Sequence, residues 1–156
     1  MLRKFLAAVL CCYPLVGIAE THELKIVHQV YDINAKSPDL MYQFKPDFLQ
    51  IKLGDQVKFP GTVGQHTVHS VKGMIPDGAK KISIMPHRPN VVTFTEPGVY
   101  GLKCKIHQRH GMVAVIVVDQ DIHNLEVARA HVKRGVSAFT REKMHRLLDR
   151  AEASVE

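Results

Sequence analysis

Short runs of alternating apolar and polar residues, separated by turn signals, extend from residue 24 to residue 118. This punctuation is typical of an all-β sandwich. Turns containing Gly with Asp or Pro fall at 54–55, 76–78 and 96–98, and their chemistry bounds strands because it fixes φ or allows a positive φ. The pattern predicts eight strands, at 24–30, 41–44, 49–53, 56–59, 67–71, 91–95, 99–104 and 113–118.

After residue 119 the apolar residues recur at helical spacing, which predicts two short helices. We expect Gly135 to end the first helix and Thr140 to cap the second, with Glu142 in a favourable place for the helix dipole. Both apolar stripes should pack on the outside of the sheet or on a partner chain. The stripes are Leu125, Ala128 and Val132 in the first helix, and Met144, Leu147, Leu148 and Ala151 in the second.

The first residues have the composition of a secretory signal, with a basic start, an apolar stretch, and small residues at Gly17 and Ala19 before Glu20. The apolar run is short and is interrupted by Pro14, which favours a cleaved leader over a retained membrane anchor. We therefore expect export to the periplasm and no stable membrane association. The predicted organisation is a cleaved signal peptide at 1–19, a β-sandwich domain at 20–118 and a helical extension at 119–156, packed on the sandwich.

Cys104 is the only cysteine left after the predicted processing, because Cys11 and Cys12 lie in the signal. A single thiol in an exported protein cannot form an internal disulfide, and such thiols are usually oxidised, paired between chains or bound to something. His107 and Met112 follow it closely in the sequence. Metal ligation explains this neighbourhood, whereas a buried inert thiol would explain Cys104 alone.

The candidate ligands are one thiolate, two imidazoles and a thioether. Alternation along 99–104 directs the Cys104 sulfur towards the core, and a short loop before 113–118 can bring His107 and Met112 back to it. His66 is a second candidate imidazole, far upstream. Two His and one Cys with a long axial Met is the arrangement that holds a blue-copper electron-transfer centre.

Other histidines allow an alternative metal site. Cys104, His107 and His110, completed by His66, could form a tetrahedral zinc site, although Met112 would then have no role. His69 follows His66 by three residues, so on a strand the two would point to opposite faces and should not share a metal. Surface or partly buried positions are expected for His22, His28, His87, His123, His131 and His145.

Taken together, the motifs resemble those of the pseudoazurins, a family of small cupredoxins that carry single electrons in the bacterial periplasm. The resemblance runs from about residue 24 to the C-terminus. Its motifs lie at 54–57, 64–66, 72–79 and 97–100, and in the Cys-x₂-His-x₄-Met segment. The resemblance implies a mainly β fold, an eight-stranded Greek-key cupredoxin sandwich followed by two short C-terminal α-helices. It also implies one type 1 copper ion, with the ligands His66, Cys104, His107 and Met112.

Four protein ligands leave no open position for a substrate, whereas catalytic metal sites keep one, so we expect no enzymatic turnover. The resemblance implies a periplasmic carrier that cycles Cu(II)/Cu(I), with His107 as the electron route and redox enzymes such as copper nitrite reductase as partners. The alternative is a periplasmic copper-binding and delivery protein. Such proteins use accessible Met and His clusters, and Met74 and Met85 are too scattered to form one.

The chain has a net charge of +6, and removing the two basic residues of the signal leaves 21 − 2 = 19 basic against 15 acidic residues, or +4. Basic residues near the candidate ligands would steer an acidic redox partner into brief, salt-sensitive encounters, although an ordinary solvated lysine surface is the alternative. The absence of Trp and of interleaved stacking aromatics argues against nucleic-acid binding. The basic residues near the candidate ligands are Lys72, Lys80, Lys81, Arg88, Lys103, Lys105 and Arg109. We expect the protein to be a monomer.

The chain also departs from the family pattern. Thr67 stands where pseudoazurins commonly have Asn after the upstream histidine ligand, which affects the tuning of the metal. The ligand loop carries Gln108, Arg109 and His110 where relatives are apolar and contain Pro. We therefore expect a docking patch that is more polar and more basic than in relatives.

Overall fold

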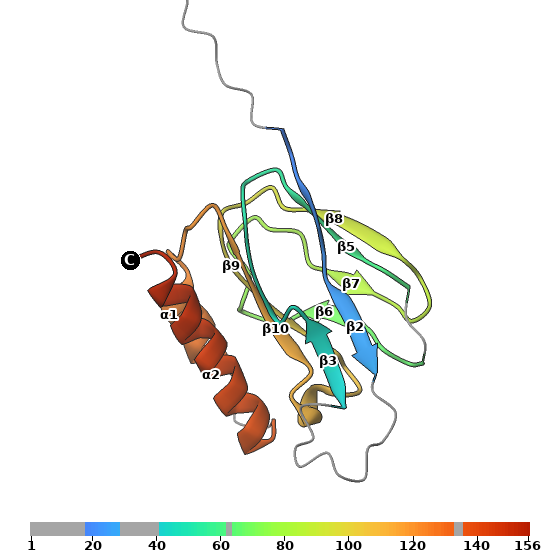
Figure 1. Ribbon diagram of the computed structural model, residues 1–156. Coiled ribbons are helices and arrows are strands. Elements are labelled where there is room, and N and C mark those ends of the chain that lie inside the picture. Colours follow the sequence, from blue (N-terminus) through green and yellow to red (C-terminus); the bar gives the residue numbers. More distant parts are fainter. Residues whose placement is uncertain (1–17, 29–40, 62–63, 133–135) are drawn as a thin grey trace, which may run out of the picture.

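Three β-sheets, one of them a two-stranded ladder, and two C-terminal helices make up the part of the chain that the computed structural model describes, residues 18–28, 41–61, 64–132 and 136–156 (Figure 1). The strand orders are β1-β5-β8, β4-β10-β9-β6-β7 and a separate β2-β3 ladder. The mainly β sandwich with two terminal helices is therefore confirmed. The strands are β1 (Thr21–Glu23), β2 (Lys25–His28), β3 (Tyr42–Lys45), β4 (Phe48–Ile51), β5 (Gln56–Phe59), β6 (Val68–Ser70), β7 (Ser83–Ile84), β8 (Asn90–Thr93), β9 (Gly98–Lys103) and β10 (Val113–Val118).

Each of the eight predicted strands overlaps an observed strand, but β1 and β7 were not predicted. The chain changes partner at the buried Leu24, since β1 pairs in parallel with β5 while β2 pairs antiparallel with β3. The predicted run, which starts at residue 24, therefore contains β2 and leaves out β1. β7 has two residues, which is too short for a periodic signal. The end of the predicted strand 24–30 lies outside the described residues.

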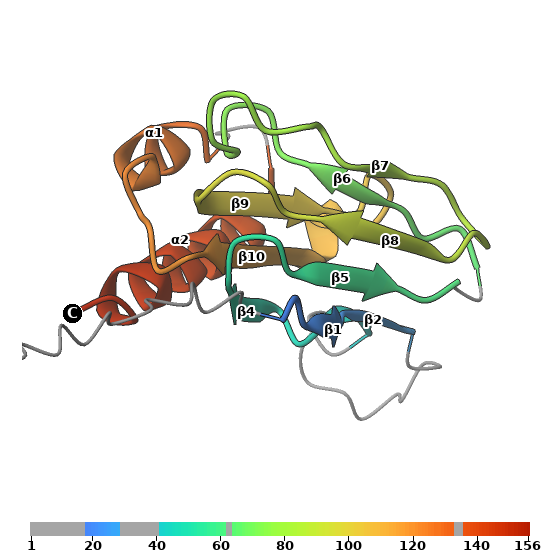
Figure 2. The ribbon, with the colours of Figure 1, turned by 90° about the horizontal axis from the view of Figure 1, so that it is seen from above.

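β10 is buried along its whole length because it is covered on both faces. Ala114, Ile116 and Val118 pack in the core between the sheets. The alternate residues Val113 and Val115 pack with the helices in a second apolar cluster. Figure 2 shows the layers from above, with β10 between the helices and the strands β5 and β8. A nearly continuous apolar strand is what burial on both faces requires.

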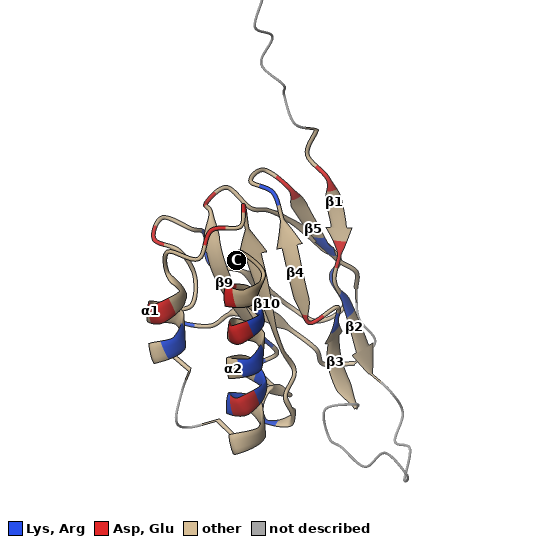
Figure 3. Ribbon diagram, turned by 60° about the vertical axis from the view of Figure 1, so that its left-hand side comes forward, with Lys and Arg blue, Asp and Glu red and all other residues tan. Residues whose placement is uncertain are grey.

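The helices are α1 (Leu125–Ala130) and α2 (Ala138–Ala153). The predicted apolar stripes pack on the sheet, with α2 along β10, while the outer face of α2 carries charges of both signs (Figure 3). The predicted cap was wrong, because Ser137 is the N-cap and its Oγ accepts from the Thr140 N–H at 3.2 Å. No acidic residue lies in the first turn, so Glu142 does not have the role expected of it. Gly135 lies outside the described residues.

Helices described in the structure are all too short or too polar to cross a membrane. Most of the predicted signal, 1–17, lies outside the described residues. The last strand ends at Val118 and the first α-helix begins at Leu125. The domain boundaries at residues 20 and 119 stay a prediction.

Candidate metal centre

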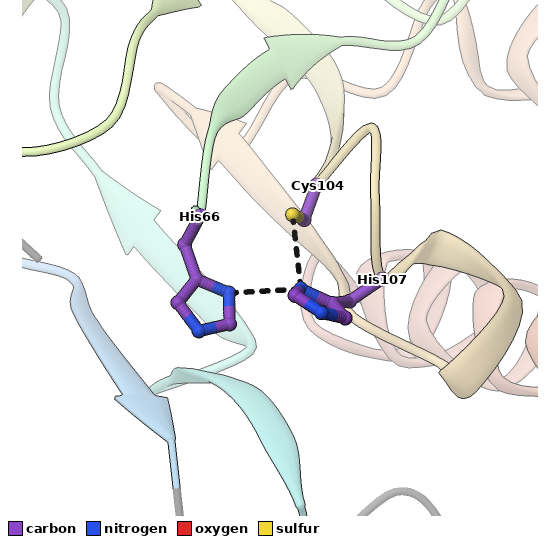
Figure 4. Close-up of side chains that lie close together, drawn as sticks. All are labelled: His66, Cys104 and His107. Carbon is purple, nitrogen blue, oxygen red and sulfur yellow. Dashed lines mark hydrogen bonds between the residues drawn. The ribbon is translucent and has the colours of Figure 1, made fainter. Parts of the chain in front are cut away.

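Three predicted ligands from two distant parts of the chain meet at one end of the sandwich. His66 lies just before β6, Cys104 follows β9, and His107 precedes the short 3-10 turn η2 (Gln108–His110). Figure 4 shows the three side chains pointing towards one another. Met112, directly before β10, is fully buried in the same core cluster as Cys104.

The donor atoms of this trio are close enough to share one ion. One ligand atom from each of the three residues lies within 4.8 Å of the others. The Cys104 Sγ is 3.7 Å from the Nδ1 of His107, and that nitrogen is 3.0 Å from the Nδ1 of His66. His66 and Cys104 are 1% and 0% exposed, whereas His107 is partly exposed. The convergence of buried donors leaves His107 as the ligand candidate nearest to solvent.

Local hydrogen bonds set the path of the ligand loop. The Cys104 N–H donates to the Met112 carbonyl at 3.0 Å, and the Cys104 carbonyl accepts from the Gln108 N–H at 2.9 Å. Gly111 has a φ of 78°, a conformation that L side chains rarely adopt, and there the chain reverses into β10. The loop is thus a short connection between β9 and β10, as predicted, with a single 3-10 turn inside it.

The terminal helix also holds this loop. The Thr140 hydroxyl donates to the Gln108 carbonyl at 2.5 Å and accepts from the Gly111 N–H at 3.2 Å. The Ser137 hydroxyl donates to the Arg109 carbonyl at 2.7 Å. Thr140 is 3% exposed. The start of α2 therefore binds three residues of the segment between His107 and Met112, namely Gln108, Arg109 and Gly111.

Thr67 contacts the thiol side of the site. Its hydroxyl accepts from the Lys105 N–H at 3.0 Å and lies 3.9 Å from the Cys104 sulfur, to which it donates. A donor to a ligating sulfur is one of the contacts that tune a metal centre. The Thr67 side chain, which is shorter than the Asn expected from the family pattern, therefore still reaches the thiol.

His28 and Tyr42 complete the surroundings, and the sequence did not indicate either. The Nε2 of His66 lies 3.4 Å from the Nδ1 of His28, and the Tyr42 ring stacks on His107 with ring centroids 3.9 Å apart. The two residues are direct partners in the β2-β3 ladder. Only that register brings them to the site, so no local sequence signal could have identified them.

Burial keeps the imidazoles neutral. Burial, followed by the charges of His107 and His28, lowers the pKa of His66 to about 4. Burial, followed by His110 and His28, also lowers the pKa of His107. Because a metal binds the neutral imidazole, the Nδ1 atoms of His66 and His107 are both available as ligands at neutral pH.

The structure does not support the alternative zinc site, because His110 does not join the other three predicted ligands. Among the residues that the structure describes, the cluster of candidate ligand atoms holds His66, Cys104 and His107 but not His110. The His110 ring centroid is 6.4 Å from that of His107. His69 is also outside the cluster, as expected, and its buried Nε2 has no hydrogen-bond partner in the described part of the chain. A thiolate with two imidazoles, and no carboxylate, suits a soft or borderline ion such as copper.

Comparisons with known proteins give the family context. The family model for copper-binding proteins of the plastocyanin/azurin family matches residues 31–119. The chain is similar to a pseudoazurin from Methylorubrum extorquens, with 42% identity over 93 residues, covering 60% of this chain and 63% of the relative. A pseudoazurin from Paracoccus pantotrophus is 31% identical over 123 residues, covering 79% of this chain and 80% of the relative.

A putative pseudoazurin from Rhizobium leguminosarum is 43% identical over 99 residues, with 64% of each chain covered. The chain thus spans less than two thirds of the Methylorubrum and Rhizobium relatives. Among solved structures, the refined crystal structure of the pseudoazurin from Methylobacterium extorquens matches with a TM-score of 0.69 and 31% identity, covering 83% of this chain and 98% of that one.

Proposed function

The chain belongs to the copper-binding plastocyanin/azurin family and, within it, to the pseudoazurins, and on that premise we propose that it is a blue copper electron carrier. One observation carries the proposal, namely the convergence of one buried thiol and two neutral imidazoles within 4.8 Å. The proposed ligands are His66, Cys104, His107 and Met112, of which the Met112 thioether would be the weakest donor. Bound copper would supply a one-electron Cu(II)/Cu(I) couple.

The residues of the site support a carrier rather than an enzyme. Three of the proposed ligands, His66, Cys104 and Met112, are at most 1% exposed, so the ion would have protein donors where a catalytic site keeps an open position. Tyr42 covers one face of His107, and Thr67 holds the sulfur. A site built in this way can lower the rearrangement that accompanies electron transfer. The electron would enter or leave through the partly exposed His107.

Docking would take place around that histidine. Lys105, Arg109 and His110 are exposed and lie beside His107 in the chain. A basic rim of this kind suits brief encounters with an acidic protein surface. We propose a periplasmic location and redox enzymes as partners, with copper nitrite reductase as the acceptor that the family resemblance implies.

The visible spectrum of the copper-loaded, oxidised protein tests the function. We expect an intense thiolate-to-copper band and a reversible one-electron couple. A colourless protein would point to zinc, and copper that is readily stripped by a weak chelator would point to delivery of the metal; either result would refute the carrier.

Single variants test the ligand set. Cys104→Ser and His66→Asn should lose the band while far-UV circular dichroism shows a folded sandwich. His110→Asn is the matched control, because His110 is outside the cluster, and it should keep the band. A blue Cys104→Ser variant would show that the sulfur is wrongly assigned.

A further inference from the structure

The main chain of Glu20 is held on both sides. Its N–H donates to the Asp55 Oδ1 at 2.8 Å, and its carbonyl accepts from the Gln56 N–H at 2.9 Å. Before it, Ala19 is exposed and Ile18 is 94% exposed. The nitrogen of Glu20 is therefore a fixed point of the fold, whereas the two residues before it extend into solvent.

Asp55 is a buried anion whose described hydrogen-bond donors are two main-chain amides and one imidazole. It is 3% exposed, and its Oδ2 accepts from the Lys52 N–H at 2.9 Å and from the His22 Nε2 at 3.0 Å. Two amides and an imidazole satisfy the hydrogen bonds of the carboxylate without a permanent positive charge. Burying an anion without a cation is costly, so a cation at any of these donor positions would stabilise the fold.

We propose that cleavage of the Ala19–Glu20 bond converts this amide into an ammonium group that binds Asp55 as an ion pair. Water hydrolyses the peptide bond, so that Ala19 gains a carboxylate and the Glu20 nitrogen gains protons to become –NH₃⁺. Gly17 and Ala19 are small residues at the positions that a signal peptidase requires. Removal of the leader would thus complete a charge pair that the uncleaved chain lacks.

The position of the cut decides whether the pair forms. The Glu20 nitrogen is already 2.8 Å from the carboxylate oxygen, so the new ammonium needs no rearrangement. A chain that starts at Ala19 would carry its charge one residue, roughly 3.5 Å, further out. A chain that starts at Thr21 would lose the donor altogether. The hydrogen bond of Glu20 and the small residues Gly17 and Ala19 therefore both indicate cleavage of the Ala19–Glu20 bond.

Other charged groups near this position are few. His22 shares the Asp55 carboxylate, and Lys52 and Asp119 line the same surface hollow, of about 320 Å³, as the Glu20 side chain. Lys52 and Asp119 carry opposite signs, so Asp55 is the dominant partner of the ammonium. None of these residues belongs to the proposed copper site, so the inference does not depend on the proposed function.

The test uses protein exported from the full-length gene. Mass spectrometry should find Glu20 as the first residue; a different first residue would overturn the proposal. The α-amine is then titrated by NMR in the folded protein. We expect its pKa to lie about one unit above the ordinary value of about 7.7–8.0, and an ordinary pKa would overturn the ion pair.

A second measurement compares the processed protein with a form acetylated at the α-amine, which keeps the N–H but removes the charge. Below the ordinary α-amine pKa, acetylation should raise the unfolding equilibrium constant about tenfold, and this difference should disappear as the pH rises through the raised pKa. In Asp55→Asn the two forms should be equal. Equal stability in the wild type, or an unchanged difference in Asp55→Asn, would refute the proposal. If Asp55→Asn does not fold, the titration of the wild type alone decides.

Discussion

Thr140→Val tests whether the terminal helix holds the ligand loop. Val has nearly the shape of Thr, so the substitution removes the hydroxyl and leaves the packing in place. The Gly111 N–H, which is buried, and the Gln108 carbonyl, which is partly exposed, both lose their hydrogen bond to Thr140 and keep the bond to each other, at 3.2 Å. Thr and Val have similar helix propensities, so α2 itself should be little affected.

The size of the effect follows from these two groups. Each group keeps one partner, so the variant loses two hydrogen bonds, each with a net contribution of about 0.5–1.5 kcal/mol. We therefore expect Thr140→Val to lose about 2 kcal/mol of unfolding free energy. Thr140→Ser keeps the hydroxyl and loses one methyl group, which should cost about 1 kcal/mol.

Urea unfolding of the copper-free protein measures this difference directly. Copper release to a chelator, followed by the loss of colour, measures whether the loop between His107 and Met112 has loosened. We expect faster release from Thr140→Val than from Thr140→Ser. A Val variant that is as stable as the Ser variant and releases copper at the same rate would show that the Thr140 hydroxyl does not hold the loop.

Three further substitutions test other parts of the molecule. Gly101→Ala would place a Cβ 2.8 Å from the Cε and 2.9 Å from the Cβ of Met74, so we expect a loss of about 1–3 kcal/mol in thermal unfolding; an unchanged midpoint would contradict it. Burial alone would raise the pKa of Asp55, but its hydrogen bonds lower it to about 2, so its contribution of about 2 kcal/mol should be present above the ordinary pKa of 3.8 and lost as the pH falls towards 2. Asp55→Asn should flatten this part of the stability profile in urea unfolding at a series of pH values, and an equally steep profile would refute it. Lys105→Ala should weaken the salt dependence of electron transfer to an acidic partner, whereas Lys52→Ala, at the opposite end of the sandwich, should not; equal effects would refute a docking role for the rim.

The features that could be predicted from the sequence are those that depend on residues close together in the chain. The alternation that directs Cys104 inward and the spacing to His107 lie within a single hairpin, so both could be predicted without a structure. The stripe of α2 was equally predictable, because it depends only on helical periodicity. These features need no knowledge of how distant strands pair.

The features of the site that were missed depend on long-range pairing. His28 and Tyr42 reach the site only through the register of β2 and β3, in which they are direct partners. The N-cap of α2 was wrongly placed because Ser137 and Thr140 are both good capping residues by type. What distinguishes them is the bond from Thr140 to Gln108, 32 residues away in the sequence.

The double-sided burial of β10 has a consequence for the lifetime of the site. Its main-chain amides, which pair with β9 along six consecutive residues, should be among the slowest in the protein to exchange their hydrogens with deuterated solvent. Cys104 and Met112 are joined by a main-chain bond at the end of this ladder. Transient opening of the sandwich edges can therefore occur many times without separating these two residues, and their separation should require an opening almost as rare as global unfolding.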